Sequence, residues 1–317
     1  MAHVWLGYAC INLTLGSKAP TSRTCRISNA TPQRLEELAR ANLKGLSEVL
    51  HWNVSQNIKV FRISSGIIPL ASHPKAQWSW LHVLRREIAA IGGFAREHCL
   101  RLSMHPGQYT VLNSPNTNVV TAAKAELLYH VQFLDAMGLT LEHKIIIHVG
   151  GVYGNREVSL RRFRENFRTL SSQVRNRLVI ENDERSYNVD DVLNLSTLLK
   201  VPIVFDYLHC KAFSKRPLKT SLLDEVCATW SASDGRPEFH YSTQKKRARR
   251  GAHADMIDPS DFKRFLRVLP QTDIDVMLEA KAKDKALLKL RLDLQSRRSV
   301  GNIVIDENFP NPRNSNR

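Results

Sequence analysis

The sequence predicts a single (β/α)8 barrel, a fold in which eight parallel strands are each followed by a helix. Eight short β-branched runs alternate with longer amphipathic runs along the chain. The 317 residues are enough for one such barrel, and no internal repeat or low-complexity linker divides them. We therefore expect one barrel domain over residues 1–299 and a loose, Asn- and Pro-rich tail over residues 300–317.

Short runs rich in Val, Ile and aromatic residues mark the strands. In chain order, we expect strands at Val4–Leu13, Ile58–Ser64, Leu100–His105, Lys144–Val149, Leu178–Glu181, Pro202–Asp206, Pro237–Tyr241 and Asp275–Glu279. Several of these runs are apolar at consecutive positions, which is typical of parallel strands that are buried on both faces. The pattern therefore favours a parallel sheet over an antiparallel one.

Amphipathic segments of helical period lie between the strands. We expect helices at Thr31–His51, Trp78–His98, Asn118–Met137, Ser159–Gln173 and Val189–Leu199. Thr31 and Pro32 form a start signal, because proline is favoured in the first helical turn. Asn188 precedes a Val-Asp-Asp turn and is a second start signal.

The composition indicates a polyanion as the partner. Lys and Arg total 46 against 30 acidic residues, a formal charge of +16, which attracts DNA, RNA or an anionic membrane. No apolar run approaches the roughly 20 residues of a membrane helix, and the N-terminus lacks the layout of a secretory signal. The five cysteines are odd in number and lack CxxC spacing. We therefore expect a cytoplasmic protein, associated with the nucleoid in a prokaryote, and no membrane partner.

Residues that can bind metal recur where the predicted strands end. The set comprises His73, His105, His148, Glu181, Asp206, His209, Glu238, His240, His253 and Glu279. In a parallel barrel the C-terminal strand ends open onto one face, so these side chains would converge there. A lone histidine at a strand end is more often packed in the core than bound to a metal. The whole set, however, is too large for one ion, and clustered divalent ions suit a phosphodiester displacement.

Short motifs across nearly the whole chain resemble the UV-damage endonucleases in order and spacing. The motifs are Gly7–Leu13, Phe61–Ser65, Ser103–Tyr109, Glu181–Glu184, Phe205–His209 and Met277–Lys281. The resemblance implies a barrel related to endonuclease IV that holds two or three divalent ions, usually Mn²⁺, with Zn²⁺, Mg²⁺ and Co²⁺ as alternatives. It implies cleavage of double-stranded DNA immediately 5′ to a UV photoproduct, which leaves a 3′-hydroxyl and a 5′-phosphate.

Carried over by motif, the resemblance makes the set above the metal ligands, with one departure. Family members often have a carboxylated lysine two residues before the histidine of the seventh strand, where this chain has Glu238. We interpret Glu238 as a substitution of equivalent charge. Tyr8 and Asn12 match residues near the scissile phosphate, and Gln108 with Tyr109 matches the probe that enters the duplex beside flipped nucleotides.

The candidate residues divide into a catalytic set and a set that contacts DNA or the lesion. The catalytic set is Tyr8, Glu181, Glu279 and Lys281, in which Glu181 binds two ions and Tyr8 orients the phosphate or the attacking water. The set that contacts DNA or the lesion is Asn12, Arg62, Gln108, Tyr109, Lys245, Lys246, Arg247, Arg249 and Arg250. Lys283 is a further candidate for a phosphate contact, and a solvated charge is the alternative for it and for the basic run. We expect a monomer without an obligate protein partner.

Three other functions fit parts of the pattern. An abasic-site endonuclease of the endonuclease IV type would have the same barrel and metals with a different lesion. A metal-dependent sugar isomerase would share the barrel and its ligands, although a neutral sugar gains nothing from a charge of +16. A DNA-binding protein with a structural metal is disfavoured, because structural sites are usually closed and four-coordinate.

Overall fold

The eight expected strands form a closed parallel barrel, which confirms the predicted fold class. The computed structural model describes residues 1–76, 78–214, 216–294, 299–300 and 303–305. The strands are β1 (Ala2–Ala9), β2 (Val60–Ile63), β3 (Arg101–Met104), β4 (Ile145–His148), β5 (Leu178–Glu181), β6 (Ile203–Asp206), β7 (Glu238–Tyr241) and β8 (Ile274–Leu278). They are paired in sequence order, and β1 joins both β8 and β2, so that the sheet closes.

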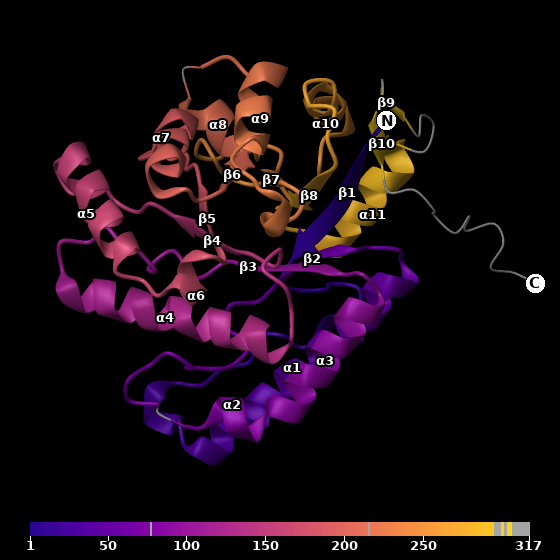
Figure 1. Cartoon of the computed structure of the whole chain (residues 1–317). Helices are drawn as coiled ribbons and strands as arrows, with labels where there is room; N and C mark the ends of the chain where they lie inside the picture. The colour runs from indigo at the N-terminus through magenta and orange to yellow at the C-terminus, as the bar shows by residue number, and fades with distance from the viewer. Residues whose placement is uncertain (77, 215, 295–298, 301–302, 306–317) are drawn as a thin grey trace, which may run out of the picture.

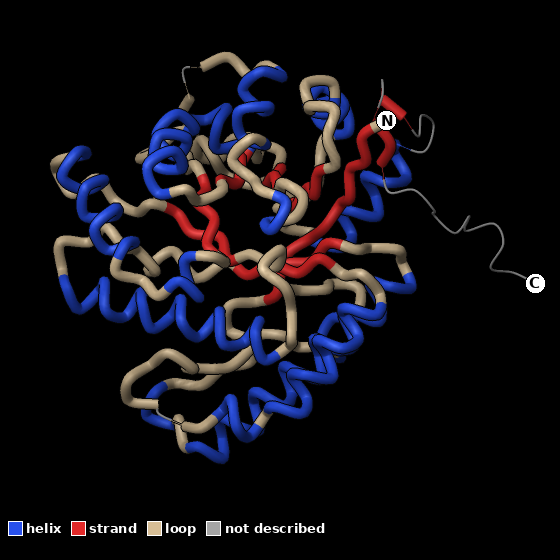
Figure 2. Tube along the Cα trace, viewed as in Figure 1, coloured by secondary structure: helices blue, strands red, loops and turns tan. Residues whose placement is uncertain are grey.

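The helices surround the strands (Figures 1 and 2). They are α1 (Pro32–Ser55), α2 (Trp80–Val83), α3 (Arg85–Glu97), α4 (Thr117–Ala136), α5 (Arg156–Arg168), α6 (Ser172–Arg175), α7 (Val189–Leu199), α8 (Tyr207–Phe213), α9 (Thr220–Cys227), α10 (Pro259–Leu266) and α11 (Lys283–Leu294). Short 3-10 turns occur at Gly16–Lys18, Ile27–Asn29 and Ala232–Asp234. In the described part of the chain, no helix combines the length and the apolarity that spanning a bilayer requires.

The two predicted helix starts are present. The Thr31 side chain accepts a hydrogen bond from the backbone of Arg34, with Pro32 as the first helical residue. Asn188 and Asp191 form a reciprocal capping box at the start of α7. Both arrangements satisfy backbone N–H groups that have no partner within a helix. These caps fix where each helix leaves the barrel wall.

Alternation along the strands separates two packed layers. The outer layer lies between the barrel and its helices and forms the main core, which includes Leu6, Phe61 and Ile180. Two small clusters are built from strand residues of the opposite parity: Ala9, Val60 and Met277 in one, and Ile146, Val179 and Val204 in the other. Because strand side chains alternate in direction, these residues point into the barrel, and all of them except Ala9 lie two positions before a polar residue at or near a strand end.

The N-terminal end of the barrel is closed by a buried ionic network. Arg101 and Asp275 are both buried, and their side chains lie 3.5 Å apart. Arg236 donates to the same aspartate at 2.9 Å, and Lys144 pairs with Asp234 at 2.5 Å. These charges leave the opposite, C-terminal end as the open face of the barrel.

Close approach of the first two strands requires a glycine. A Cβ atom at Gly7 would lie 2.6 Å from the carbonyl oxygen of Val60, which is closer than any side chain tolerates. The small residue therefore lets β1 pair with β2 and complete the ring.

Several expected boundaries differ from the structure. The segment expected as one helix from Trp78 to His98 is divided into α2 and α3, and the segment at Ser159–Gln173 is divided into α5 and α6. The helices α8 to α11 lie outside the five ranges expected as helices, although a (β/α)8 barrel requires helices in this part of the chain. Residues 299–300 form strand β9 and Ile303–Ile305 form β10, which pairs in parallel with β1, so this part of the expected tail is ordered against the barrel. Residues 306–317 of that tail lie outside the described residues.

Candidate metal centre and DNA-binding face

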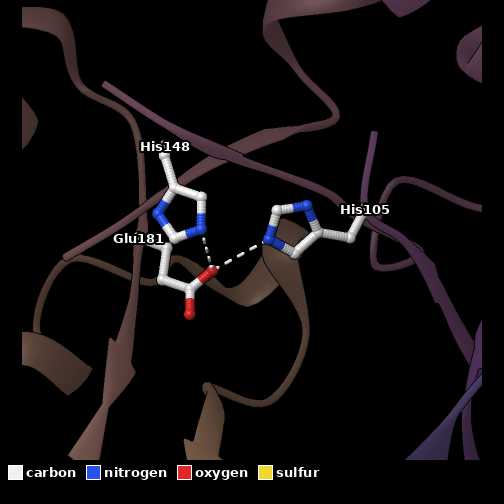
Figure 3. Close-up of side chains that lie close together, drawn as sticks. All are labelled: His105, His148 and Glu181. Atoms are coloured by element: carbon white, nitrogen blue, oxygen red, sulfur yellow. Dashed lines mark hydrogen bonds and ion pairs between the residues drawn. The ribbon is translucent and has the colours of Figure 1, made fainter. Parts of the chain in front are cut away.

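Glu181 lies at the centre of a cluster of imidazole and carboxylate groups on the open face. It is the last residue of β5, and its side chain is buried. Its Oε2 atom lies 3.0 Å from Nε2 of His105 and 3.4 Å from Nε2 of His148, as Figure 3 shows. Its Oε1 atom lies 2.7 Å from Nδ1 of His240. One carboxylate therefore faces three histidines that come from three different strands or strand ends.

The described residues form two groups whose ligand atoms all lie within 4.8 Å of one another. The first group is His105, His148 and Glu181, and the second is Glu181, Asp206, His240 and Glu279. Both groups have the imidazole and carboxylate composition that suits Mn²⁺, Zn²⁺ or Fe²⁺. Because Glu181 belongs to both, a metal in each group would share this carboxylate.

Two further histidines extend the cluster. Nδ1 of His209 lies 3.8 Å from Oε1 of Glu181, and Nδ1 of His253 lies 3.7 Å from Oε2 of Glu279. The His209 ring centroid lies 5.9 Å from those of both His148 and His253. The histidines expected at the ends of β3, β4 and β7 and in the loops after β6 and β7 thus gather around the two groups.

Three of the histidines are held by backbone carbonyl groups. Nδ1 of His105 lies 3.0 Å from the carbonyl oxygen of Pro106, and Nδ1 of His209 lies 3.0 Å from that of Asn182. Nδ1 of His253 lies 2.9 Å from the carbonyl oxygen of Glu279. A carbonyl oxygen can only accept, so Nδ1 carries the proton in each ring. The neutral ring then has its lone pair on Nε2, which is the arrangement typical of metal-ligating histidines.

The contact between His105 and Glu181 needs a shared cation. With the His105 proton on Nδ1, Nε2 is an acceptor, and it faces a carboxylate oxygen at 3.0 Å. Two acceptors at this distance repel each other unless a proton or a metal ion lies between them. Among the described residues, Oδ2 of Asp206 is also buried without a hydrogen-bond partner. This atom fits a site for metal ions.

The charges of the cluster shift its protonation. Although burial acts in the opposite direction, His240 and His148 hold the pKa of Glu181 well below its usual range. Burial lowers the pKa of His148 to about 4, which leaves its ring neutral at pH 7. Burial opposes protonation of His209 too, but Asp206 and Glu181 raise its pKa to about 9. Metal binding at His209 must therefore displace a proton.

Arg62 lies beneath the cluster, and its expected role as a DNA contact stays a prediction. The side chain is buried, and one guanidinium nitrogen lies 2.5 Å from Oε1 of Glu279. The other donates to Nε2 of His240 at 2.6 Å. A buried arginine that is paired with two cluster residues supports both of them.

Glu238 is buried below the cluster and lies outside both ligand groups. Its Oε1 atom accepts a hydrogen bond from the Ser103 hydroxyl at 3.2 Å and lies 3.4 Å from Nε2 of His240. Burial opposes ionisation, but His240 and Arg62 hold the pKa of Glu238 below its usual range. The residue at the position of the modified lysine is thus a carboxylate beside a candidate ligand.

The expected roles of Tyr8 and Asn12 at the phosphate are not supported by their contacts. The Tyr8 hydroxyl is buried, donates to Oδ1 of Asn53 at 2.7 Å and accepts from Nδ2 of Asn12 at 2.9 Å. Asn12 is buried too, and its Oδ1 atom accepts from the backbone of Leu15 at 2.8 Å. Since both side chains have their partners within the protein, they fix the loop after β1.

His73 and Lys281 also lie apart from the two groups. His73 is in the loop after β2, where Nδ1 accepts from the backbone of Lys75 at 3.1 Å. Neither group of candidate ligands in the described residues includes it, and its expected place as a ligand stays a prediction. Lys281 is exposed two residues after Glu279, and its backbone is bound to the carbonyl group of Ala254 at 3.1 Å.

Gln108 and Tyr109 project from the loop after β3. Both are exposed, and Tyr109 has 82% of its surface exposed, so its ring does not pack against the barrel. Beside them lies a hollow of about 340 Å³ whose wall includes His105, Gln108, His148 and Arg249. The expected probe thus stands at the rim of a hollow that reaches two of the candidate ligands.

The basic run forms a loop between β7 and α10, on the same face. Gln244 and His253 form an antiparallel bridge at its base, so the run emerges next to a histidine of the cluster. Arg249 lies 3.4 Å from Glu184, and Arg250 donates to the carbonyl group of Lys211 at 2.9 Å. The loop, with Lys211, lines a second hollow of about 420 Å³. All five cations lie in one exposed or half-exposed segment.

Sequence reasoning missed the role of Asn182. Its Oδ1 atom accepts from the backbone N–H of Asp206 at 2.9 Å, and its Nδ2 atom donates to the carbonyl group of Asp206 at 3.1 Å. Its own carbonyl oxygen holds His209. The available signal is an amide directly after Glu181, a candidate ligand at a strand end. Its burial, which the structure shows, makes this amide a support for the next strand end.

Comparisons with known proteins agree on one family. A family model described as UV-endonuclease UvdE matches residues 4–309. A UV DNA damage endonuclease of Clostridium perfringens (strain 13 / Type A) is 37% identical over 287 residues, which cover 90% of this chain and 69% of that protein. One of Bacillus cereus (strain Q1) is 36% identical over 273 residues, which cover 85% and 86%.

Solved structures agree with the fold. The crystal structure of SacUVDE has a TM-score of 0.86 at 40% identity, over 93% of this chain and 99% of that one. Endonuclease IV from Thermus thermophilus has a TM-score of 0.52 at 14% identity, over 93% and 100%. A D-psicose 3-epimerase has a TM-score of 0.51 at 12% identity, over 94% and 98%. The last two likenesses show the barrel fold alone.

Proposed function

The chain belongs to the UV-endonuclease UvdE family, and from this we propose that it is a metal-dependent DNA-repair endonuclease. Its substrate is double-stranded DNA with a UV photoproduct, namely a cyclobutane pyrimidine dimer or a 6-4 photoproduct. It hydrolyses the phosphodiester bond immediately 5′ to the lesion and leaves a 3′-hydroxyl and a 5′-phosphate. The enzyme acts as a monomer.

One observation carries the metal dependence: Glu181 belongs to two adjacent groups of ligands. Each group supplies at least three ligand atoms within 4.8 Å of one another. His105 and His253 have their Nδ1 protons bound to backbone carbonyl groups, which leaves Nε2 to bind a cation, and His209 is held in the same way but must first lose a proton. This arrangement of the rings would destabilise a site that serves only for packing, because Nε2 lone pairs would face a carboxylate with no cation between them.

Two or three divalent ions would be held by these groups, with Mn²⁺ as the native metal. The ligands are His73, His105, His148, Glu181, Asp206, His209, His240, His253 and Glu279. When bound, the ions would lower the pKa of water and neutralise charge on the attacking and departing oxygens of the phosphate. Arg62 and Asn182 are positioning residues, because they contact ligands through hydrogen bonds and not the substrate.

Glu238 supports the centre without binding a metal directly. It lies 3.4 Å from Nε2 of His240 and accepts from Ser103. Arg62 donates to the same nitrogen, and the negative charge of Glu238 stabilises the arginine that holds this histidine. This is the contribution that we assign to the residue that replaces the family's modified lysine.

Gln108 and Tyr109 are proposed to enter the duplex where the damaged nucleotides leave it. An exposed aromatic ring can stack on the neighbouring bases, and an amide can satisfy exposed base edges. The adjacent hollow of about 340 Å³ opens onto two candidate ligands, so an extruded nucleotide would bring its phosphate towards the centre. Lys245, Lys246, Arg247, Arg249 and Arg250 bind the backbone of the flanking duplex without reading its sequence.

Nicking of end-labelled duplexes tests this proposal. One duplex carries a single thymine dimer, a second carries a single abasic site, and a third is undamaged, each incubated with Mn²⁺ or with EDTA. We expect a cut directly 5′ to the dimer in Mn²⁺ and none in EDTA or in undamaged DNA. Cutting of the abasic duplex alone would reassign the enzyme to the endonuclease IV type. The absence of any cutting would refute the proposal.

A further inference from the structure

The loop after β1 exposes two apolar side chains on the open face of the barrel. Ile11 has 42% and Leu13 has 40% of its surface exposed, on either side of the buried Asn12. Single exposed apolar residues are common on protein surfaces and need no explanation. These two are different, because they lie together on the face that carries the metal centre, on a loop that is fixed at both ends.

Hydrogen bonds hold the beginning of this loop. Cys10 adopts a left-handed backbone conformation with φ of 72°, which is unfavourable for a residue with a side chain. Its N–H donates to the carbonyl group of Arg62 at 2.8 Å, and its carbonyl oxygen accepts from the Thr21 hydroxyl at 2.7 Å. The strained turn is therefore imposed by its surroundings.

A buried carboxylate holds the end of the loop. Asp284, in the first turn of α11, accepts from the N–H of Leu13 at 2.6 Å and from the N–H of Thr14 at 3.1 Å. It also accepts from the Thr14 hydroxyl at 2.5 Å. Charge-assisted hydrogen bonds of this kind are about twice as strong as neutral ones. Ile11 and Leu13 are thus presented on a rigid support.

Two lysines lie in the segment that leads into the bracing aspartate. Lys283 precedes the bracing aspartate, and its charge acts on the neighbouring Cys10. Lys281 is exposed in the same segment, two residues after Glu279 of the metal centre. An apolar point with lysines beside it is complementary to a duplex whose base stack is apolar and whose backbone is anionic.

We propose that Ile11 and Leu13 form an apolar wedge that enters the base stack of damaged DNA next to the lesion, while Lys281 and Lys283 bind the adjacent phosphates. The wedge rests on the proposed function of the same face. Leucine and isoleucine side chains that insert between base pairs unstack them and bend the duplex. The wedge would act with the Gln108–Tyr109 probe from a separate loop, so that the duplex is opened from two directions.

The test compares a paired with an opened substrate. The double variant Ile11→Ser/Leu13→Ser is assayed on a duplex with one paired thymine dimer and on one in which the dimer faces two mismatched bases. We expect kcat/KM on the paired duplex to fall by about tenfold or more, because unstacking costs a few kcal/mol per step. On the opened duplex the loss should be less than about twofold, since that cost has already been met.

Controls separate the wedge from a loss of folding or charge. Leu198→Ser removes a leucine that is 52% exposed on α7 and should leave both activities unchanged. The conservative pair Ile11→Val/Leu13→Ile should retain wild-type activity on both substrates. Fluorescence of 2-aminopurine beside the dimer should rise when the wild type binds and rise less with the serine variant. Titrations of Mn²⁺ should be the same for all of these proteins.

Three outcomes would overturn the wedge. Equal activity of the serine variant and the wild type on the paired duplex would do so, as would equal losses on both substrates. A wild-type dimer in sedimentation that the serine variant abolishes would assign the pair to contact with a second copy. If the wild type nicks no damaged duplex, it is the proposed function that fails, so the two failures are distinguishable.

Discussion

Replacement of Glu181 by glutamine should disable the metal centre while it keeps the shape of the side chain. In the first ligand group, Glu181 is the only carboxylate beside His105 and His148, so Glu181→Gln leaves that group without negative charge. In the second group, two of the three carboxylates remain. One pair of unit charges 4 Å apart is worth about 4 kcal/mol at an effective dielectric constant of 20. Affinity of the first group for Mn²⁺ should therefore fall by at least about a thousandfold.

Calorimetric titration of the metal-free protein with Mn²⁺ measures this effect. We expect the wild type to bind two or three ions and Glu181→Gln to lose at least one of them, with nicking of the dimer duplex reduced in parallel. Asp275→Asn is the control, because this aspartate is also buried but lies in the ionic network at the opposite end of the barrel. It should lower stability and leave Mn²⁺ binding unchanged. Wild-type metal binding and nicking by Glu181→Gln would refute the reasoning.

Three further changes have defined outcomes. Tyr109→Ala should leave the melting temperature unchanged, because the ring is 82% exposed. It should weaken binding of dimer DNA by about tenfold or more, since stacking is worth about 1–3 kcal/mol per base. Unchanged binding would remove Tyr109 from the probe. Lys246→Gln/Arg247→Gln should lower the slope of log affinity against log salt by about 2, and an unchanged slope would show that these cations do not contact phosphates. Burial and the nearby Arg101 lower the pKa of His143 from 6.5 to about 4, so the unfolded chain takes up this proton first and stability is lost as pH falls from 6.5 to 4. Urea denaturation should show a loss of about 3 kcal/mol that His143→Asn removes, and the same pH dependence in that variant would contradict the assignment.

The sequence was sufficient for the barrel and for most of the clustered residues. Apolar strands that end in His148, Glu181 and Asp206 indicate a parallel barrel with polar groups at one end. The strand Leu178–Glu181 and the helix Val189–Leu199 were predicted to the residue. Their limits are set by local signals, a polar strand end in one and a capping box in the other.

The direction in which a side chain points is harder to predict than the strand that carries it. Tyr8 and Arg62 are both strand residues in motifs of the family, yet one points to the helices and the other into the barrel. Arg62 lies two residues after Val60, so both side chains point into the barrel. Its partner Glu279 is more than 200 residues away in sequence, so spacing alone does not predict the pair. Similarly, the pairing of Ile303–Ile305 with β1 joins the two ends of the chain, which no local pattern predicts.

Short helices were missed because packing and caps define them more than periodicity does. α8 has seven residues and begins where Asp206 accepts a hydrogen bond from the backbone of His209 at 2.6 Å. A carboxylate that is a candidate ligand therefore also starts a helix. The same bond places His209 one turn beyond Asp206 and beside Glu181.

The most direct test of the metal-dependent centre is the restoration of nicking in metal-stripped protein. The protein is treated with EDTA, dialysed, and mixed in excess with a duplex that carries one thymine dimer, while Mn²⁺ is added in equivalents. We predict no cutting without metal and full single-turnover cutting immediately 5′ to the dimer after two to three equivalents, with a 3′-end that a polymerase extends. Full cutting by protein shown to be free of metal would contradict the account.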